Sequence, residues 1–469
     1  MDKGIVGYFR WKITLQKRAP QRDNVIKTLK SEEHQMYRTD EIELSKTLQV
    51  KYKRYIRKFT QDFSLPEQKF INHTVFGILS SRSCIVRRVS QNLKESISLK
   101  KTSKRLSYHL PKEHFDTKLS DNLLRMQSIK LNEESIIIAD PGDIMKKYAK
   151  KMEGLSSVRD GSKGEWGKGY DILDFVSVDV GFDKKVKIKP LVSDLYSAEM
   201  EEVTLKTKFF NRINDIQVYS NNKGIFTVDR GYDDKKVIDY FYRNDASFVL
   251  RSKGVRDVYY KGEKMSFSKV SRKACLSYTF TGRSRHEQLL AGAVQVSVPV
   301  DPHPRKKNAV LAPITLIVAR YKTGKKLGGF FYLFCSFPTH EMSEEKLIEK
   351  ALRCYRIRWK IEEVYRQVKS DFNWESIQLM KYQSLKTFNS LLLAALIFLY
   401  DLESMKLQFA QTYTCLMLES KNKLKELSKF VYYRLSLALS YCFQFMKKYH
   451  KLKYKNHKSY DLQTVLVCI

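Results

Sequence analysis

Four side chains near the carboxyl-terminal third of the chain have types and spacing suited to chemistry on phosphates. Tyr355, Arg358, Glu362 and Lys369 stand at offsets of 0, 3, 7 and 14 residues. One continuous helix would place them within an arc of about 60° and over a length of about 21 Å. A carboxylate binds hard metal ions, while Arg and Lys bind phosphate oxygens. The spacing therefore indicates phosphodiester chemistry, and the alternative is an amphipathic helix with solvated charges. Trp359 is predicted to pack in the core.

Two aspartates upstream each end an apolar stretch. Asp229 follows residues 224–228 and begins Asp-Arg-Gly-Tyr, whereas Asp140 follows a run of isoleucines and alanine. Two-metal phosphoryl transfer requires several converging carboxylates, and strand ends hold such groups rigidly. Asp140 and Asp229 are therefore the candidates, with Asp179 in reserve. Residues 141–142 are predicted to turn into a helix that Asp143 caps.

The Tyr-x2-Arg-x3-Glu-x6-Lys spacing and the Asp229-Arg-Gly-Tyr block together resemble bacterial insertion-sequence transposases with a DDE triad. The resemblance covers about residues 130–400. It implies that Asp140, Asp229 and Glu362 are the catalytic, metal-binding carboxylates of a ribonuclease-H-like core. Two Mg²⁺ ions, with Mn²⁺ as a substitute, are the implied cofactors. The residues that the resemblance, or a shared helix face, assigns to DNA contacts are Tyr355, Arg358, Lys369 and Arg366.

The same resemblance implies that the protein binds terminal inverted repeats, cuts the DNA strand there and transfers the end to target DNA. A homodimer on double-stranded DNA is the implied assembly, and a hairpin intermediate is implied as well. Two alternatives remain open at this point. One is a metal-dependent DNA nuclease or resolvase on the same fold, and the other is a catalytically inert DNA-binding relic.

The composition agrees with a nucleic-acid partner. The chain has 469 residues, 43% of them hydrophobic, and its 86 Lys and Arg against 51 Asp and Glu give a formal charge of +35. This excess opposes compaction unless a polyanion binds. Seven scattered cysteines without a CxxC pair indicate reduced thiols. The longest apolar run, residues 391–400, is too short to span a bilayer. We expect a cytoplasmic, nucleoid-associated bacterial protein without a membrane partner.

The amino-terminal region is predicted to be helical and to bind DNA ends. Residues 1–60 are basic and irregular, and Ser64 to Glu67 form a capping box that begins a helix to about residue 79. A second amphipathic segment spans residues 84–93. These helices are compatible with a helix-turn-helix reader or with an ordinary bundle. The cations proposed to contact DNA are Arg87, Arg88, Lys104 and Arg105.

Patterns from residue 135 onward predict an α/β fold. Strands are expected at 135–140, 174–181, 187–197, 224–229 and 247–251, with helices at 203–219 and 233–244, the latter capped by Asp233. This order is that of a ribonuclease-H-like mixed sheet. The apolar helix at 389–402 is assigned to the core, with an interface as alternative. The predicted regions are a DNA-end-binding region at 1–130, the first part of the core at 131–254, a β-rich insertion at 255–340, the signature helix at 341–380, and a helical region with a dimerisation role at 381–469.

Overall fold

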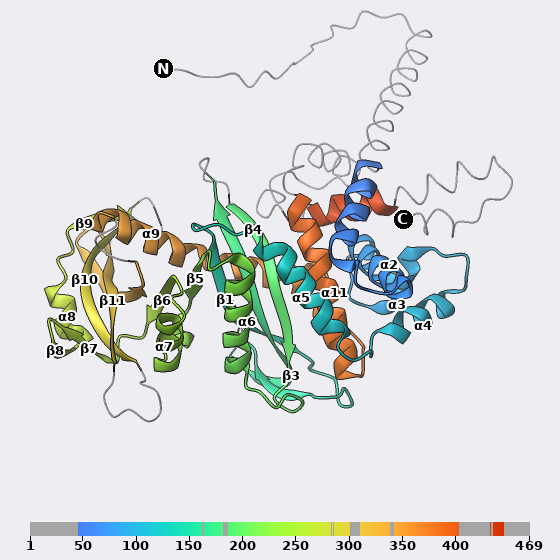
Figure 1. Ribbon diagram of the computed structural model, residues 1–469, viewed down its shortest axis with the longest axis horizontal. Helices are drawn as coiled ribbons and strands as arrows, with labels where there is room; N and C mark the ends of the chain where they lie inside the picture. The colour runs from blue at the N-terminus through green and yellow to red at the C-terminus, as the bar shows by residue number, and fades with distance from the viewer. Residues whose placement is uncertain are drawn as a thin grey trace, which may run out of the picture.

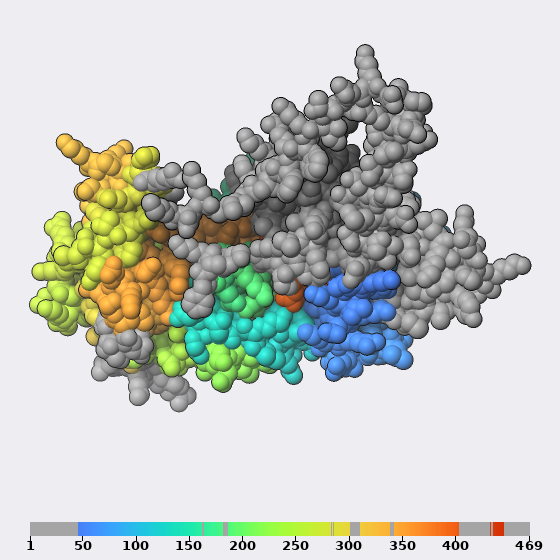
Figure 2. All heavy atoms as spheres, turned by 90° about the horizontal axis from the view of Figure 1, so that it is seen from above, coloured from blue at the N-terminus to red at the C-terminus, as the bar shows by residue number. Residues whose placement is uncertain are grey.

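A computed structural model describes residues 46–161, 164–181, 186–282, 284, 286–300, 310–337, 342–402, 432 and 435–444. It is a mixed α/β protein with one large mixed sheet and helices on both faces. Its parts follow one another along the long axis, with amino-terminal helices at one end, a central sheet, and a strand-rich insertion at the other end (Figure 1). The view from above shows the same succession (Figure 2). Residues 1–45, 403–431 and 445–469 of the predicted terminal regions lie outside the described residues.

The central part of the sheet has the strand order β4-β3-β1-β5-β6. β1 pairs antiparallel with β3 and parallel with β5, and β5 pairs parallel with β6. The connections β4–α6–β5 and β5–α7–β6 supply the helices, so the predicted alternation of strands and helices is confirmed. The bounds are β1 Ile136–Met145, β2 Ser156–Arg159, β3 Trp166–Val180, β4 Val186–Tyr196, α6 Leu205–Ser220, β5 Ile225–Val228, α7 Lys235–Arg243 and β6 Phe248–Ser252.

Two local predictions in this part were wrong. β1 does not end at Asp140 but runs on to Met145, because the long β3 continues to pair with it. Pro141 is tolerated there because β1 has no β5 partner after Ala139, which makes it locally an edge strand. Asp233 does not cap α7. Asp234 does so by accepting a hydrogen bond from Lys236 N, while Asp233 pairs with Arg256.

The insertion extends the same sheet. β12 pairs antiparallel with β6, and β11 and β10 follow outward, so the insertion is rich in strands, as predicted. The far edge of β10 pairs with β9 over residues 288–291 and with β7 at Ser297. The bounds are β7 Asp257–Tyr260, β8 Glu263–Ser266, α8 Phe267–Lys273, β9 Tyr278–Thr281, β10 Glu287–Val300, β11 Val310–Thr323 and β12 Lys326–Cys335.

The amino-terminal helices pack against a long apolar helix, α11, Tyr382–Asp401. The predicted capping box is present, since Ser64 N and Oγ both donate to Glu67. For residues 46–60 the prediction of an irregular segment was wrong, because these residues are helical and bury apolar side chains, Tyr52 and Tyr55 among them. The remaining bounds are α2 Leu65–Ser81, α3 Val86–Leu93, α4 Leu99–His109 and α5 Phe115–Ser128.

Helix α11 is longer than the apolar run suggested. It is long and apolar enough to span a membrane, but 89% of its most apolar window is buried inside the protein. It contacts β4, α5 and α2, and Tyr55 donates to its Ala394 carbonyl at 2.6 Å. These contacts favour the core role over an interface.

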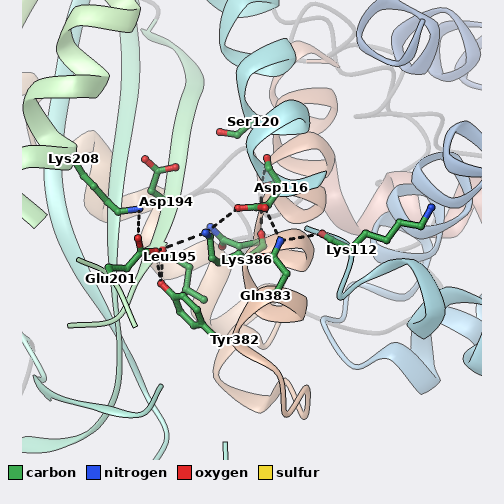
Figure 3. A network of polar contacts seen from close by, with 12 residues as sticks. Lys112, Asp116, Ser120, Asp194, Leu195, Glu201, Lys208, Tyr382, Gln383 and Lys386 are labelled. Atoms are coloured by element: carbon green, nitrogen blue, oxygen red, sulfur yellow. Dashed lines mark hydrogen bonds and ion pairs between the residues drawn. The ribbon is translucent and has the colours of Figure 1, made fainter. Parts of the chain in front are cut away.

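A charged network joins the amino-terminal helices to the central sheet (Figure 3). Lys386 of α11 lies 3.3 Å from Asp116 of α5 and 3.7 Å from Glu201, which precedes α6. Glu201 also accepts from Tyr382 at 2.9 Å, and Gln383 donates to Asp116 at 2.6 Å. One cation therefore connects three parts of the chain that are far apart in sequence.

Candidate active site

Two of the candidate carboxylates stand side by side at the centre of the sheet. Ala139 of β1 and Val228 of β5 are partners in a parallel ladder, so Asp140 and Asp229 are the next residues on neighbouring strands. Neighbouring strands lie about 4.8 Å apart, and adjacent residues point to opposite faces. Ala139 and Val228 belong to the core on one face. Asp140 and Asp229 therefore lie on the other face, where α9, Glu344–Ile357, contacts β5 and α10, Lys360–Arg366, contacts β1.

The segment after α9 brings the third carboxylate to this pair. Tyr355 Oη donates to Asp229 Oδ1 at 3.2 Å. Arg358 donates from Nη1 to Asp140 Oδ2 at 3.2 Å and from Nη2 to Glu362 Oε1 at 3.4 Å. One guanidinium thus connects a strand carboxylate with a helix carboxylate.

The signature residues do not share one continuous helix, contrary to the prediction. The chain turns tightly at Arg358 and Trp359, where Glu362 N donates to the Trp359 carbonyl three residues back. After α10 it passes into a π-helix, Gln367–Asp371. The tight turn directs Arg358 inward and leaves Trp359 61% exposed, so the prediction that Trp359 packs in the core was also wrong. Single π-helical turns inside helices are frequent at functional sites.

The charges at the site depend on one another. Burial raises the pKa of Asp140 to about 6; Arg358 lowers that pKa, while Asp229 and Glu362 raise it. Burial alone would lower the pKa of Arg358, but Asp140 and Asp229 raise it above the ordinary value. Arg358 is only 7% exposed, so its charge acts in a low-dielectric setting. The three carboxylates therefore lie within electrostatic reach of one buried cation.

The chemistry of the donors fits a hard divalent cation, which takes carboxylate oxygens. The geometry of this conformation does not yet form such a site. Among the residues that the structure describes, no three His, Cys, Asp or Glu side chains lie close enough to hold a metal ion. Arg358 supplies positive charge between the carboxylates instead.

Other predicted residues lie near the cluster or away from it. Lys369 Nζ is 3.0 Å from Asp143 Oδ2 and 3.5 Å from Glu375, so it is engaged with carboxylates of its own chain. Arg366 is exposed. Glu363 pairs with Lys360 at 2.8 Å. The reserve candidate Asp179 is removed from the cluster, because it lies five positions along β3 from the partner of Asp140 and pairs with Lys189.

The predicted amino-terminal contacts divide into exposed and engaged cations. Arg87 and Arg88 are exposed on α3, and Lys104 is exposed on α4. Arg105 differs from them, since its Nη2 lies 2.7 Å from Glu95 Oε1 and 3.1 Å from His73 Nδ1. It therefore holds α4 against α2.

Sequence reasoning gave no role to three residues that the fold places at the site. Arg251 follows Leu250, the ladder partner of Val228, and its guanidinium lies 5.4 Å from the Tyr355 ring. Tyr365 donates to the Asp140 carbonyl at 2.5 Å. Asp174 is the antiparallel partner of Asp140 and is 7% exposed. Burial raises its pKa to about 7, with Asp194 and Asp140 adding to the rise. The sequence held a signal for Arg251, since it ends the apolar strand predicted at 247–251 just as Asp229 ends the strand predicted at 224–229.

The chain is similar in part to a known protein family and to a solved structure. Residues 198–398 match the family model described as the transposase DDE domain. This match supports a DDE transposase. The matched segment includes Asp229 and Glu362, whereas Asp140 precedes it. Among solved structures, a piggyBac transposase synaptic complex with hairpin DNA is similar over 84% of this chain and 77% of that chain, with 10% identity and a TM-score of 0.36. No curated protein matches this chain.

Proposed function

We propose that this protein is the DNA transposase of an insertion sequence, with a ribonuclease-H-like core and Asp140, Asp229 and Glu362 as its catalytic triad. The observation that carries the proposal is the position of these three carboxylates, from two parallel strands and one helix, relative to Arg358: Asp140 and Glu362 accept hydrogen bonds from it, and Asp229 lies within its electrostatic reach. The strand order β4-β3-β1-β5-β6, with β5 and β6 parallel to β1, supports the proposed core. The family match over residues 198–398 supports the class of reaction.

In the proposed mechanism Asp140, Asp229 and Glu362 would hold Mg²⁺ ions, with Mn²⁺ as a substitute. Ions bound there would supply activation of a nucleophilic oxygen and charge stabilisation of the leaving oxygen at the phosphate. The protein's own groups position the DNA. Arg358 offers two donors to a phosphate and Tyr355 offers a hydroxyl and a ring. Arg358 now pairs with Asp140 and Glu362, and its guanidinium would be available to a phosphate if another cation compensated these carboxylates.

The proposed DNA partners are the element's terminal inverted repeats and a target duplex, in the bacterial cytoplasm. The exposed cations of α3 and α4, Arg87, Arg88 and Lys104, support an end-binding role for the amino-terminal helices. A homodimer that holds two ends is part of the proposal.

The test uses Glu362→Gln with a duplex that carries the element's own end. We expect unchanged affinity for that duplex and loss of Mg²⁺-dependent cleavage by more than about 100-fold, since even outer-shell changes at metal sites cost 10–100-fold. Gel-based cleavage and binding assays measure the two properties separately. Glu363→Gln is the matched control, because Glu363 is adjacent but pairs with Lys360.

Cleavage by Glu362→Gln at the wild-type rate would exclude this site. Wild-type protein that cuts the end but never joins it to a second duplex would be a nuclease. Protein that binds the end without any cleavage in Mg²⁺ or Mn²⁺ would be a DNA-binding relic.

A further inference from the structure

The outer edge of the insertion has a gap in its strand pairing. β9 covers β10 over residues 288–291 and β7 meets it at Ser297, so residues 292–296 have no strand partner on that edge within the described chain. A groove of about 610 Å³ opens there. Ala293 N, which faces the gap, is satisfied by Glu344 Oε1 at 3.0 Å.

The walls of the groove carry phenol rings and ammonium groups. Tyr259, Tyr260, Lys261 and Lys273 line it from the side of β7 and α8. The Nζ atom of Lys261 lies 5.6 Å from the centre of the Tyr260 ring, and neither lysine has a carboxylate partner within the described part of the chain. Glu344 is the acidic group in the lining, and its Oε1 atom is already engaged with Ala293.

The surface around the groove is basic as well. Two further exposed cations on α8, Lys269 and Arg272, add to the two lysines of the lining, against the exposed acid Glu263, while Asp257 and Lys264 pair with each other. Lysines beside tyrosine rings suit a nucleic-acid strand, since ammonium groups neutralise phosphates and rings stack on bases. The charge of the groove is therefore complementary to DNA.

Helix α9 determines the distance between the groove and the candidate active site. Helix α9 begins with Glu344 at the groove and carries Tyr355 near its other end, and Arg358 follows directly. Fourteen residues of helix from Glu344 to Arg358 rise about 21 Å. At 3.4 Å per base pair this distance corresponds to about six base pairs of duplex.

The side on which the groove lies is also informative. The amino-terminal helices and the insertion are at opposite ends of the molecule, with β1 and β5 between them (Figure 1). DNA that runs from the amino-terminal helices across the catalytic carboxylates continues toward the insertion. If the helices hold the terminal repeat, the insertion faces the DNA on the other side of the cut.

We propose that the groove between β7, α8 and β10 binds the donor DNA that flanks the element, about six base pairs outside the scissile phosphate. This inference rests on the proposed transposase function. It adds a second contact region for DNA. The enzyme would bind an end with an intact flanking duplex more tightly than the same end after the flank is removed.

The first test uses Cys275, an exposed thiol in the lining of the groove. Wild-type protein is alkylated alone or with end duplexes that have about 2 or about 15 base pairs of native flank. Mass spectrometry of the Cys275 peptide measures the rate. We expect the long flank to slow alkylation about tenfold or more and the short flank to leave the rate unchanged.

The second test compares affinities. For wild type the long flank tightens binding relative to the short flank, and in Lys261→Ala/Lys273→Ala this ratio falls to near one. The salt dependence of long-flank binding should lose about two units of slope, one per phosphate contact. Lys264→Ala is the matched control, because Lys264 pairs with Asp257 at 3.3 Å and lies outside the groove lining. It should keep the wild-type ratio.

The outcomes separate the two proposals. Failure of wild type to bind or cut any end duplex would refute the transposase function itself. Binding of ends with equal Cys275 reactivity at both flank lengths would overturn the groove assignment alone. Equal protection by an unrelated duplex without the end would also overturn it, and would assign the groove to target DNA instead.

Discussion

The geometry of the candidate site depends on one residue, Arg358, through its guanidinium group. It is 7% exposed and lies between Asp140 and Glu362, where a carboxylate pair without a cation would be unfavourable. Breaking a buried ion pair by removing one partner is costly because it leaves an uncompensated charge. Arg358 therefore stabilises the metal-free protein as well as serving as a phosphate ligand in the proposed reaction.

Arg358→Ala should lower the stability of the metal-free protein by about 1–3 kcal/mol, because Asp140 and Glu362 lose their shared partner. Added Mg²⁺ should raise the Tm of this variant more than it raises the Tm of wild type, since an ion then supplies the missing charge. Thermal unfolding with and without Mg²⁺ measures both effects. Cleavage of the end duplex should be lost.

Arg353→Ala is the control for this experiment. Arg353 lies on α9, the helix that precedes Arg358, but it pairs with Glu134, a carboxylate that is 58% exposed. An exposed pair contributes about 0–1 kcal/mol, so this variant should show the wild-type response to Mg²⁺. An equal Mg²⁺ response in Arg358→Ala would contradict the idea that the guanidinium and the metal compensate the same carboxylates.

At the scale of elements, α2 and α4 are held together by a partly buried ionic group. Glu95 accepts hydrogen bonds from Thr102 and Arg105 of α4 and lies 3.4 Å from His73 of α2. Burial alone would raise the pKa of Glu95, but His73, Arg105 and Thr102 together lower it to about 2. The ionised form is therefore the one that stabilises the helix pair.

Glu95→Gln should destabilise the protein at neutral pH and have little effect near pH 2. A depressed pKa gives a contribution that is complete above the ordinary value of 4.5 and is lost as pH falls toward 2. Urea unfolding of wild type and variant across this window measures the difference. The exposed Glu113→Gln serves as the reference. A difference that stays constant from pH 5 to about pH 2 would show that Glu95 acts through packing and not through charge.

The elements differ in how well they could be predicted. The strand ending at Val228 is fully buried and apolar, and the helix after Ser64 has a capping box, so both had strong local signals. The extension of β1 past Pro141 had none, because it depends on the length of β3, its partner. The tight turn at Arg358 and Trp359 was also missed. Both residues keep helical backbone angles, so the turn differs little from the continuous helix that the spacing predicted.

At the scale of the whole molecule, the network around Lys386 ties the amino-terminal helices to the sheet that carries the candidate site (Figure 3). Lys386→Met should destabilise the protein by about 2 kcal/mol, because Asp116 loses its cation in a side chain that is 9% exposed. We expect the helices to become cleavable by protease before the central sheet. Urea unfolding and limited proteolysis measure the two effects.

Lys130→Met is the comparison for this variant. Lys130 pairs with Asp401 at 3.0 Å, but both side chains are about a third exposed, so the loss should not exceed about 1 kcal/mol. Equal destabilisation by the two substitutions would mean that the Lys386 network does not couple the two parts.

Whole-molecule geometry also limited what could be predicted of the site. Residue types and spacing were enough to propose Asp229 and Glu362, because each stands in a local pattern. The contact between Arg358 and Asp140 joins positions that are far apart in sequence, and pairwise spacing contains no information on it. Lys369 had the right spacing, yet the π-helix turns it toward Asp143.

The pairing of β12 with β6 makes the insertion a continuation of the ladder that also contains β5. A shared ladder resists independent swinging, so the distance from the outer edge to Asp229 is fixed by backbone hydrogen bonds and not by a hinge. If the groove binds flanking DNA as proposed, any misfit between a straight double helix and this surface must be absorbed by curvature of the nucleic acid. Bending would cost less free energy in flanks rich in flexible TA or CA steps. The choice of donor site would then depend on base sequences that no side chain contacts.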